Sequence, residues 1–126
     1  MLNEVNVQPM LPVKDLTSAE RYYGETLGLE RIDGQPGEAS VYRSGRTTLC
    51  VYRSEFAGTN KGTAALWEVD DVEATVQELK RKGVKFEHYD MPGLTLEGDI
   101  HRAGDLRVAW WKDPAGNILS VQNRPA

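Results

Sequence analysis

One pattern of secondary structure occurs twice in this chain, and this repeat limits the folds that the chain can adopt. The segment from Val13 to Leu16 recurs in type as the segment from Val69 to Val72, an offset of 56 residues (69 − 13). In both places the segment stands between an alternating strand pattern and an amphipathic helix pattern, and three strand patterns follow. Two copies of a unit that cannot close its own core predict that the copies pack together into one structure.

The first copy begins with period-two alternation of apolar and polar residues from Glu4 to Val13, which is typical of a half-buried strand. Its two prolines indicate an edge strand or a bulge, because proline lacks the backbone donor of a sheet ladder. A helix follows, with Asp15 or Thr17 as its cap and Gly28 after its last turn. The three strands expected next are Leu29–Asp33, Ala39–Arg43 and Thr47–Arg53.

The second copy repeats this order after a polar loop. Its expected elements are a strand over 63–69, a helix capped by Asp71 and stopped by Gly83, a strand over 84–90, a long loop over 91–105, and strands over 106–112 and 118–122. The sequence therefore predicts one α+β domain over residues 1–126, with a first βαβββ module at about 4–53 and a second at about 63–122. It leaves open whether the modules pair within one chain or between chains.

Composition narrows the function. The chain has 126 residues, of which 15 are basic and 19 acidic, for a net charge of −4. This balance argues against a nucleic-acid binder, which would need a basic surface. A single cysteine, Cys50, allows no intrachain disulfide, and no segment approaches the roughly 20 apolar residues of a membrane span. With no signal-peptide pattern at the N-terminus, we expect a cytoplasmic protein with no membrane partner.

The strands predict two kinds of sheet face. One face of each strand pair is uniformly apolar and suited to packing under helices, and Trp111 belongs to it. The opposite faces mix apolar, aromatic and polar groups, which is typical of a ligand cavity, although a solvent-facing sheet surface is the alternative. The candidate ligand-binding residues on these mixed faces are Gln8, Met10, Cys50, Tyr52, Ala64, Leu66, Glu68, Trp110, Ile118, Ser120 and Gln122.

Three passages, over residues 11–30, 65–84 and 109–122, resemble the vicinal oxygen chelate superfamily in type and order. This superfamily includes glyoxalase I, extradiol dioxygenases, fosfomycin-resistance enzymes and bleomycin-resistance proteins. The resemblance implies a half-barrel of mixed sheet curled around a cavity, with the helices outside. It says less about function, because the fold hosts several chemistries and some proteins that only bind.

The resemblance also implies four positions for metal ligands, usually His or Gln, Glu, His and Glu. In this sequence they fall at Gln8, Cys50, Ala64 and Ser120. Only Gln8 matches the pattern, and a catalytic ion needs about three anionic or imidazole ligands. We therefore expect no metal site and no cofactor; a divalent metal is expected only if other residues supply the ligands.

Few residues remain as alternative chemical groups. We expect His88 and His101 to be surface histidines, with the 91–105 loop as a possible lid or second cluster. Cys50 is expected to be a buried structural thiol rather than a nucleophile. Glu68 is the one candidate catalytic acid, as a general base if burial raises its pKa or as a contact for a cationic ligand; an exposed glutamate at a strand end is the alternative.

Three functions are compatible with these residues. The first is a metal-independent binder of an aromatic or amphipathic small molecule, similar to bleomycin-resistance proteins, which are homodimers with clefts shared by two chains. The second is a glyoxalase-like lyase or an extradiol-dioxygenase-like metalloenzyme with non-standard ligands. The third is a scaffold without a ligand, in which the tryptophans are core and interface. The first is our prediction, and with it a homodimer; the sequence does not identify the ligand.

Overall fold

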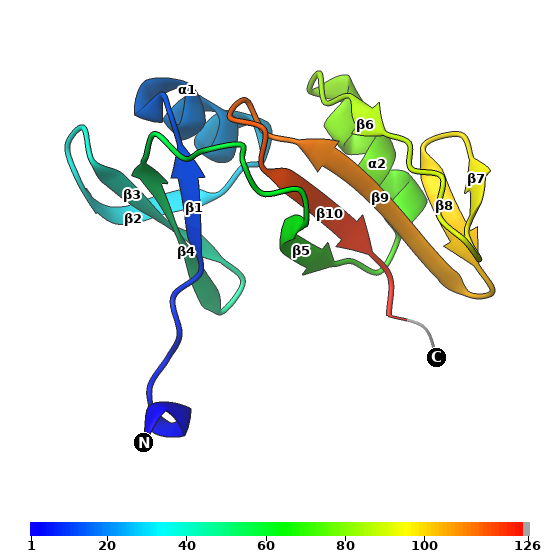
Figure 1. Ribbon diagram of the computed structural model, residues 1–126, viewed down its shortest axis with the longest axis horizontal. Helices are drawn as coiled ribbons and strands as arrows, with labels where there is room; N and C mark the ends of the chain where they lie inside the picture. Colours follow the sequence, from blue (N-terminus) through cyan, green and yellow to red (C-terminus); the bar gives the residue numbers. More distant parts are fainter. Residues whose placement is uncertain (125–126) are drawn as a thin grey trace.

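The computed structural model describes residues 1–124 and contains the doubled unit as two separate mixed sheets (Figure 1). The first sheet has the strand order β1-β4-β3-β2, and the second has the order β5-β10-β9-β8-β7, with β6 also paired to β9. β1 and β4 are parallel, as are β5 and β10, and every other pair is antiparallel. The architecture is the predicted α+β arrangement of open sheets rather than a closed barrel.

The first unit agrees closely with its predicted elements. Its elements are β1 (Met10–Val13), α1 (Leu16–Arg21), the π-helical turn η2 (Tyr22–Thr26), β2 (Glu30–Gln35), β3 (Ala39–Ser44) and β4 (Thr47–Arg53). Asp15 is the helix cap, since its carboxylate accepts hydrogen bonds from the backbone N–H groups of Thr17 and Ser18. Gly28, at φ 74°, ends the helical segment in the left-handed conformation that favours glycine.

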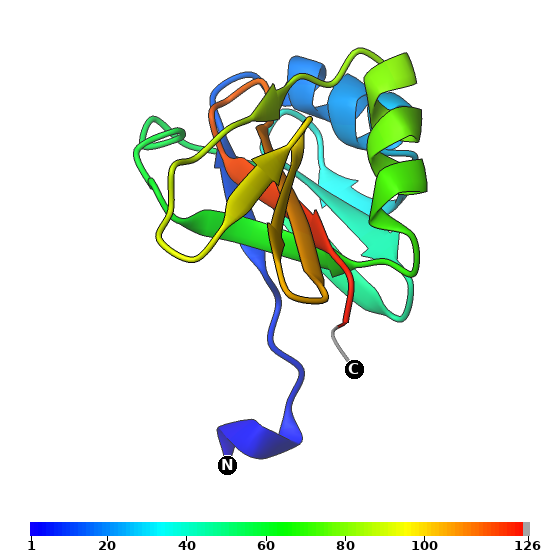
Figure 2. The same ribbon diagram turned by 90° about the vertical axis from the view of Figure 1, so that its right-hand side faces the viewer.

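The N-terminal segment differs from the prediction. A short 3-10 turn, η1 (Leu2–Glu4), precedes an extended stretch, and all of residues 1–10 are exposed. The predicted strand over 4–13 is therefore wrong before Met10, and Gln8 lies outside β1. The register leaves residues 4–6 without a partner, because Met10 pairs with Cys50 and β4 begins only three residues earlier, at Thr47, and Pro9 lacks the backbone donor that would continue the ladder. Figure 2 shows this segment leading away from the sheets.

The second unit contains more strands than expected. Its elements are β5 (Thr63–Glu68), α2 (Val72–Arg81), β6 (Phe86–Glu87), β7 (Thr95–Glu97), β8 (Ile100–Ala103), β9 (Leu106–Lys112) and β10 (Ile118–Gln122). β6 is shorter than the predicted strand over 84–90. The segment 91–105, predicted to be a long loop, instead carries the hairpin of β7 and β8, which adds two strands to the sheet.

The two units pack together through one buried core within the chain. Its members come from both units, with Leu11, Val51 and Tyr23 from the first and Trp111 and Leu119 from the second all at 2% exposure or less. The apolar faces predicted from alternation are the ones that enter this core, and Trp111 lies in it as predicted. Helix α1 packs against β4 of the first sheet, and α2 packs against β9 and β10 of the second. No helix among residues 1–124 is long and apolar enough to cross a membrane.

Candidate functional site

The second sheet collects most of the predicted site residues on the face that points away from the core. Strand register places Leu66 beside Ser120, and Ser120 beside Trp110, in one row across β5, β10 and β9. The next row joins Glu68, Gln122, Val108 and His101, across β5, β10, β9 and β8. Because paired residues in a sheet point to the same side, these side chains share one face. The prediction of a common mixed face is thus consistent with the register, and its role in binding remains a prediction.

The Trp110 side chain extends across this face. Its indole Nε1 donates a 3.1 Å hydrogen bond to Thr63 Oγ1, so the ring reaches from β9 across β10 to β5. Ser120 lies on the strand that the ring crosses and is only 2% exposed. Ile118, on the same strand and face, is 9% exposed. Trp110 is therefore available to a ligand, whereas Ser120 lies under a side chain that would have to move first.

His101 is not the surface histidine that the sequence suggested. It lies on β8, is fully buried, and has Trp110 edge-on to its ring at a centroid distance of 4.9 Å. Tyr89 stacks on the same ring at a centroid distance of 6.3 Å and meets Trp110 edge-on at 5.4 Å. The prediction failed because polar neighbours made 91–105 resemble a loop. Gly98 and Gly104 could have indicated a strand between them, because both are turn glycines at positive φ on either side of the four residues of β8.

The hydrogen bonds of His101 fix which ring nitrogen carries the proton. The backbone N–H of Tyr89 donates to His101 Nε2 at 2.9 Å. A neutral imidazole that accepts at Nε2 carries its proton on Nδ1. That Nδ1 is buried and has no partner among the described residues, and the same is true of the Tyr89 hydroxyl. The site therefore holds two polar atoms next to Trp110 that an acceptor or donor from outside could satisfy.

His88 lies near this cluster but belongs to the surface, as predicted. Its Nε2 lies 2.8 Å from Asp99 Oδ1, and Lys80 donates to the other oxygen of the same carboxylate, also at 2.8 Å. These two hydrogen bonds, from Lys80 first and from His88 second, lower the pKa of Asp99. Asp99 thus joins Lys80 of α2 to the turn between β7 and β8, so the role of His88 and Asp99 here is structural.

The first sheet carries the remaining predicted residues. Met10 is 51% exposed, and its strand partner Cys50 is 7% exposed. Burial raises the pKa of the Cys50 thiol, which keeps it protonated near neutral pH, as expected of a structural cysteine. Gln8 is exposed outside the strand, where its Oε1 accepts a 3.2 Å hydrogen bond from Thr48 Oγ1. Tyr52, two residues beyond Cys50 on β4, is half-buried on the same face.

Glu68 does not have the environment that a general base requires. It is exposed, and Arg124 donates to its Oε2 at 2.9 Å. The hydrogen bonds and positive charge of Arg124 lower the pKa of Glu68, whereas the predicted role needed burial to raise it. The structure thus favours the alternative of an exposed ion pair at a strand end. No other acid replaces it among the predicted residues.

The four positions that correspond to metal ligands do not form a metal site. Cys50 belongs to the first sheet and Gln8 lies just before its strand β1, whereas Ala64 and Ser120 belong to the second sheet, and no described strand of one sheet pairs with a strand of the other. Together they offer an amide, a protonated thiol, a methyl group and a buried hydroxyl, which does not fit a catalytic divalent ion. Within residues 1–124, no three His, Cys, Asp or Glu side chains gather closely enough to hold a metal.

This architecture of paired βαβββ units is that of a known superfamily. The family model for the Glyoxalase/Bleomycin resistance protein/Dioxygenase superfamily matches residues 5–121, so the chain belongs to that superfamily. This confirms the resemblance seen in the sequence. No curated protein matches the sequence significantly.

Solved structures show the same fold at low sequence identity. Lactoylglutathione lyase from Agrobacterium tumefaciens has a TM-score of 0.72 at 21% identity, covering 94% of this chain and 92% of its own. A bleomycin-binding protein from Streptomyces verticillus, complexed with copper(II)-bleomycin, has 0.67 at 25%, covering 96% and 97%. An antibiotic-binding protein from Streptomyces sp. CB03234 has 0.65 at 22%, covering 97% and 98%. The fold therefore includes both an enzyme and proteins named for binding.

Proposed function

We propose that this protein binds a small aromatic or amphipathic molecule, without a bound metal, on the open faces of its two sheets. The observation that carries the proposal is the position of Trp110. Its half-buried indole stands on a sheet face in the same row as Leu66, with Ser120 between them, and Leu66 is 47% exposed. An exposed large apolar side chain on the same sheet face as an aromatic ring is typical of a recognition site. The neighbouring proteins that bind bleomycin and another antibiotic support this choice of ligand class.

The two open faces are equivalent parts of the doubled unit. Met10 on β1 corresponds to Leu66 on β5 through the offset of 56 residues (66 − 10), and the two are exposed to similar extents, 51% and 47%. β1 and β5 are also edge strands, each with one unpaired side among the described residues. We propose that a second copy of the chain pairs these edges and encloses a cleft between the first sheet of one copy and the second sheet of the other.

The polar groups of the second face would orient the ligand. Leu66 lies in the row of Trp110 and Gln122 lies in the next row, and His101 Nδ1–H is a buried donor without a partner among residues 1–124. A ligand that moves the Trp110 ring would reach Ser120 and this donor. An aromatic contact with Trp110 contributes about 0.5–1.5 kcal/mol beyond the burial of area. The site is therefore suited to a planar ring that carries an acceptor group.

The test is a titration of bleomycin, with and without copper, followed by calorimetry on the wild type and on Trp110→Ala. We expect Trp110→Ala to weaken binding roughly tenfold, because a stacking surface is lost. The matched control is Phe56→Ala, which removes another exposed aromatic ring from the 54–62 loop and should leave the affinity unchanged. Equal affinity of Trp110→Ala and wild type would refute this site. Turnover of a glutathione hemithioacetal on addition of zinc or nickel would instead favour a lyase.

A further inference from the structure

We propose that the chain has a second small-molecule site on the opposite side of its second sheet, between the two units. The site is an apolar cavity of about 210 Å³ and would take a small neutral aromatic molecule that carries one hydrogen-bond acceptor. Its lining comes from the core faces of β5, β9 and β10, from α2 and from the segment after η2. The open face that bears Trp110 takes no part in it, so this inference does not depend on the function proposed above.

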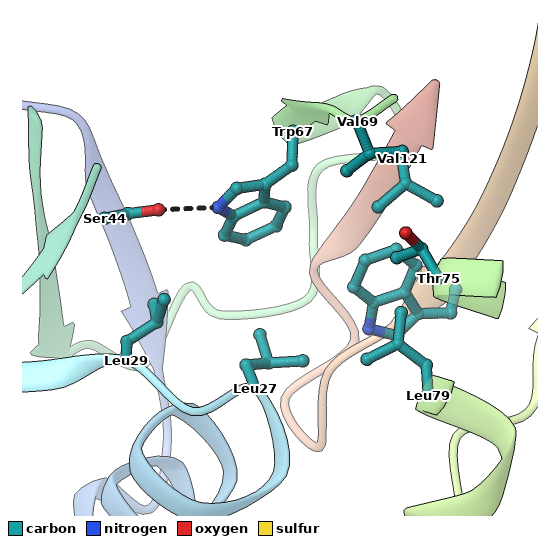
Figure 3. Close-up of a pocket in the computed structure, with 9 residues that line it drawn as sticks. Leu27, Leu29, Ser44, Trp67, Val69, Thr75, Leu79 and Val121 are labelled. Atoms are coloured by element: carbon teal, nitrogen blue, oxygen red, sulfur yellow. Dashed lines mark hydrogen bonds between the residues drawn. The ribbon is translucent and has the colours of Figure 1, made fainter. Parts of the chain in front are cut away.

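The cavity lies where the units meet without filling the space between them. Leu27 and Leu29 of the first unit face Trp67 and Leu79 of the second across it (Figure 3). Val69 and Val121 lie side by side beyond the Trp67 ring in the same view. Leu27, Leu29, Trp67 and Leu79 are all only partly buried, although they pack against the core. Apolar side chains that line a space of this size without filling it leave contacts that a ligand could supply.

The volume sets the size of the ligand. An apolar cavity of about 150 Å³ is known to admit benzene. A cavity of about 210 Å³ therefore has room for one substituted ring and is too small for a drug-sized ligand, whose pockets start at about 300 Å³.

The shape of one wall favours a flat ligand. Trp67 and Trp111 stack with ring centroids 6.1 Å apart and planes 21° apart, and both line the cavity. Two nearly parallel indoles present a flat apolar surface on which an aromatic ring can pack offset or edge-on. Phe86 meets Trp111 edge-on at 5.7 Å and holds that indole from another side. The wall is thus fixed before a ligand arrives.

The polar atoms at the cavity decide the chemistry of the ligand. Trp67 Nε1 is already satisfied, because it donates a 2.9 Å hydrogen bond to Ser44 Oγ. Trp111 is 1% exposed, and its Nε1 has no partner among residues 1–124. Burial raises the pKa of Tyr22 to about 12, and the nearby Trp111 side chain opposes this rise. The Tyr22 hydroxyl is therefore close to Trp111, but the two side chains do not meet the geometry of a hydrogen bond. Ser44 also lines the cavity, and its hydroxyl accepts from Trp67 but donates to no group among residues 1–124, so an acceptor on the ligand would find a donor at this wall.

An entrance is also present. A surface hollow lined by Thr26, Ala74, Glu78 and Lys82 shares Leu27, Thr75 and Leu79 with the cavity. Thr75 adds no free donor, because its hydroxyl binds the backbone oxygen of Asp71 at 2.9 Å. A ligand can therefore enter between α2 and the end of η2 and pass Leu27 and Leu79 to reach the indole wall.

The probe for this site is acetophenone, a single ring with one carbonyl acceptor, and its comparison is ethylbenzene, which has nearly the same shape without the acceptor. Binding is followed by the indole N–H signals of the three tryptophans in nitrogen-15 NMR, assigned with Trp67→Phe and Trp110→Phe. We expect acetophenone to shift the Trp111 signal and to bind roughly three- to tenfold more tightly than ethylbenzene, the share of one hydrogen bond. This readout leaves Trp111 unchanged, which matters because Trp111 is a core residue.

Two variants locate the bound probe. Leu27→Phe adds a ring at the entrance and should abolish binding, while Leu96→Phe makes the same change at an exposed position of β7, away from the cavity, and should not. A shift confined to the Trp110 signal, or affinity unaffected by Leu27→Phe, would overturn the second site and assign the probe to the open face. Absence of any shift at millimolar acetophenone would also overturn it. Neither result bears on bleomycin binding, which depends on Trp110.

Discussion

The hydroxyl of Tyr23 donates a 2.7 Å hydrogen bond to Oδ2 of Asp113, 90 residues further along the chain, and both side chains are buried. The same carboxylate accepts from the backbone N–H groups of Ala115 and Asn117 and from the Asn117 side chain. Asn117 also donates to the backbone oxygen of Pro12 at 2.7 Å. The Asp113 turn therefore joins the helical segment and first strand of one unit to the last two strands of the other.

Replacing Tyr23 by phenylalanine removes one of the four donors of a buried carboxylate. We expect Tyr23→Phe to lower the free energy of unfolding by about 1.5–3 kcal/mol, because a hydrogen bond to a charged group is lost in a buried place. Urea denaturation measures it. Tyr52→Phe is the matched control, since the Tyr52 hydroxyl makes no hydrogen bond within residues 1–124, and should change little. Equal effects of the two variants would mean that the Tyr23–Asp113 bond contributes nothing.

The Asp113 turn also contacts the loop at 54–62, and this contact depends on a glycine. A Cβ at Gly58 would overlap the backbone oxygen of Ala115, and Gly58 has φ 78°. Gly37 has φ 74° with nothing near its Cβ position, so it isolates the cost of the backbone angle. We expect Gly37→Ala to cost about 1 kcal/mol, and Gly58→Ala to cost clearly more, because it also displaces backbone. Thermal melting of both variants tests this, and equal losses would contradict it.

The stability of the Asp99 cluster should depend on pH. Hydrogen bonds from Lys80 and His88 lower the pKa of Asp99 in the folded chain. The ionised carboxylate therefore stabilises the fold above its unfolded pKa, about 3.9, and this contribution is lost as the pH falls through the lower folded pKa. We expect Asp99→Asn to lose about 1 kcal/mol at pH 7 and to match the wild type near pH 2.

Urea denaturation of wild type and Asp99→Asn across pH 2–7 measures this difference. Glu55→Gln provides the control, since Glu55 is exposed and takes part in no ion pair among the described residues. Its stability difference from the wild type should stay small at every pH. A gap between Asp99→Asn and the wild type that did not narrow at low pH would show that the charge of Asp99 is not the cause.

The proposed dimer makes a prediction about the exposed N-terminal segment. Val7 is 90% exposed and Val5 is 62% exposed, on an extended stretch directly before β1. If a second copy covers β1, a charge at Val7 should weaken the association at least tenfold, because an apolar contact becomes a buried charge. Light scattering against concentration measures this for wild type and Val7→Asp. A monomeric wild type at micromolar concentration would refute the dimer.

The proposal of metal-independent binding predicts the outcome of metal removal. Protein purified without an affinity tag or chelator should contain far less than one zinc, nickel, manganese or iron per chain, as counted by elemental analysis, and should stay so after dialysis against excess ion. Exhaustive treatment with a chelator should leave bleomycin affinity unchanged. Stoichiometric metal would show that ligands other than Gln8, Cys50, Ala64 and Ser120 hold it, and would direct mutagenesis to His88, Asp99 and the acids near them.

The local elements and the buried face of each strand could be predicted from the sequence. The ranges of β4, β9 and β10 agree with the prediction residue for residue, and the faces carrying Val51, Trp111 and Leu119 enter the core as expected. These features follow from alternation, capping residues and turn glycines, which act over a few residues and can be recognised in the sequence.

The partners of each polar group could not be predicted, because they depend on how distant segments pack. His101 looked like a loop residue until strand pairing with Val108 placed it under Trp110 and Tyr89. Glu68 could have been a base until Arg124 was found beside it, 56 residues away in sequence. The cavity beside Trp111 likewise exists because the side chains of the two units do not fill the space between them. Burial, pKa and free donors depend on contacts between distant segments, and those contacts are fixed only when the units pack.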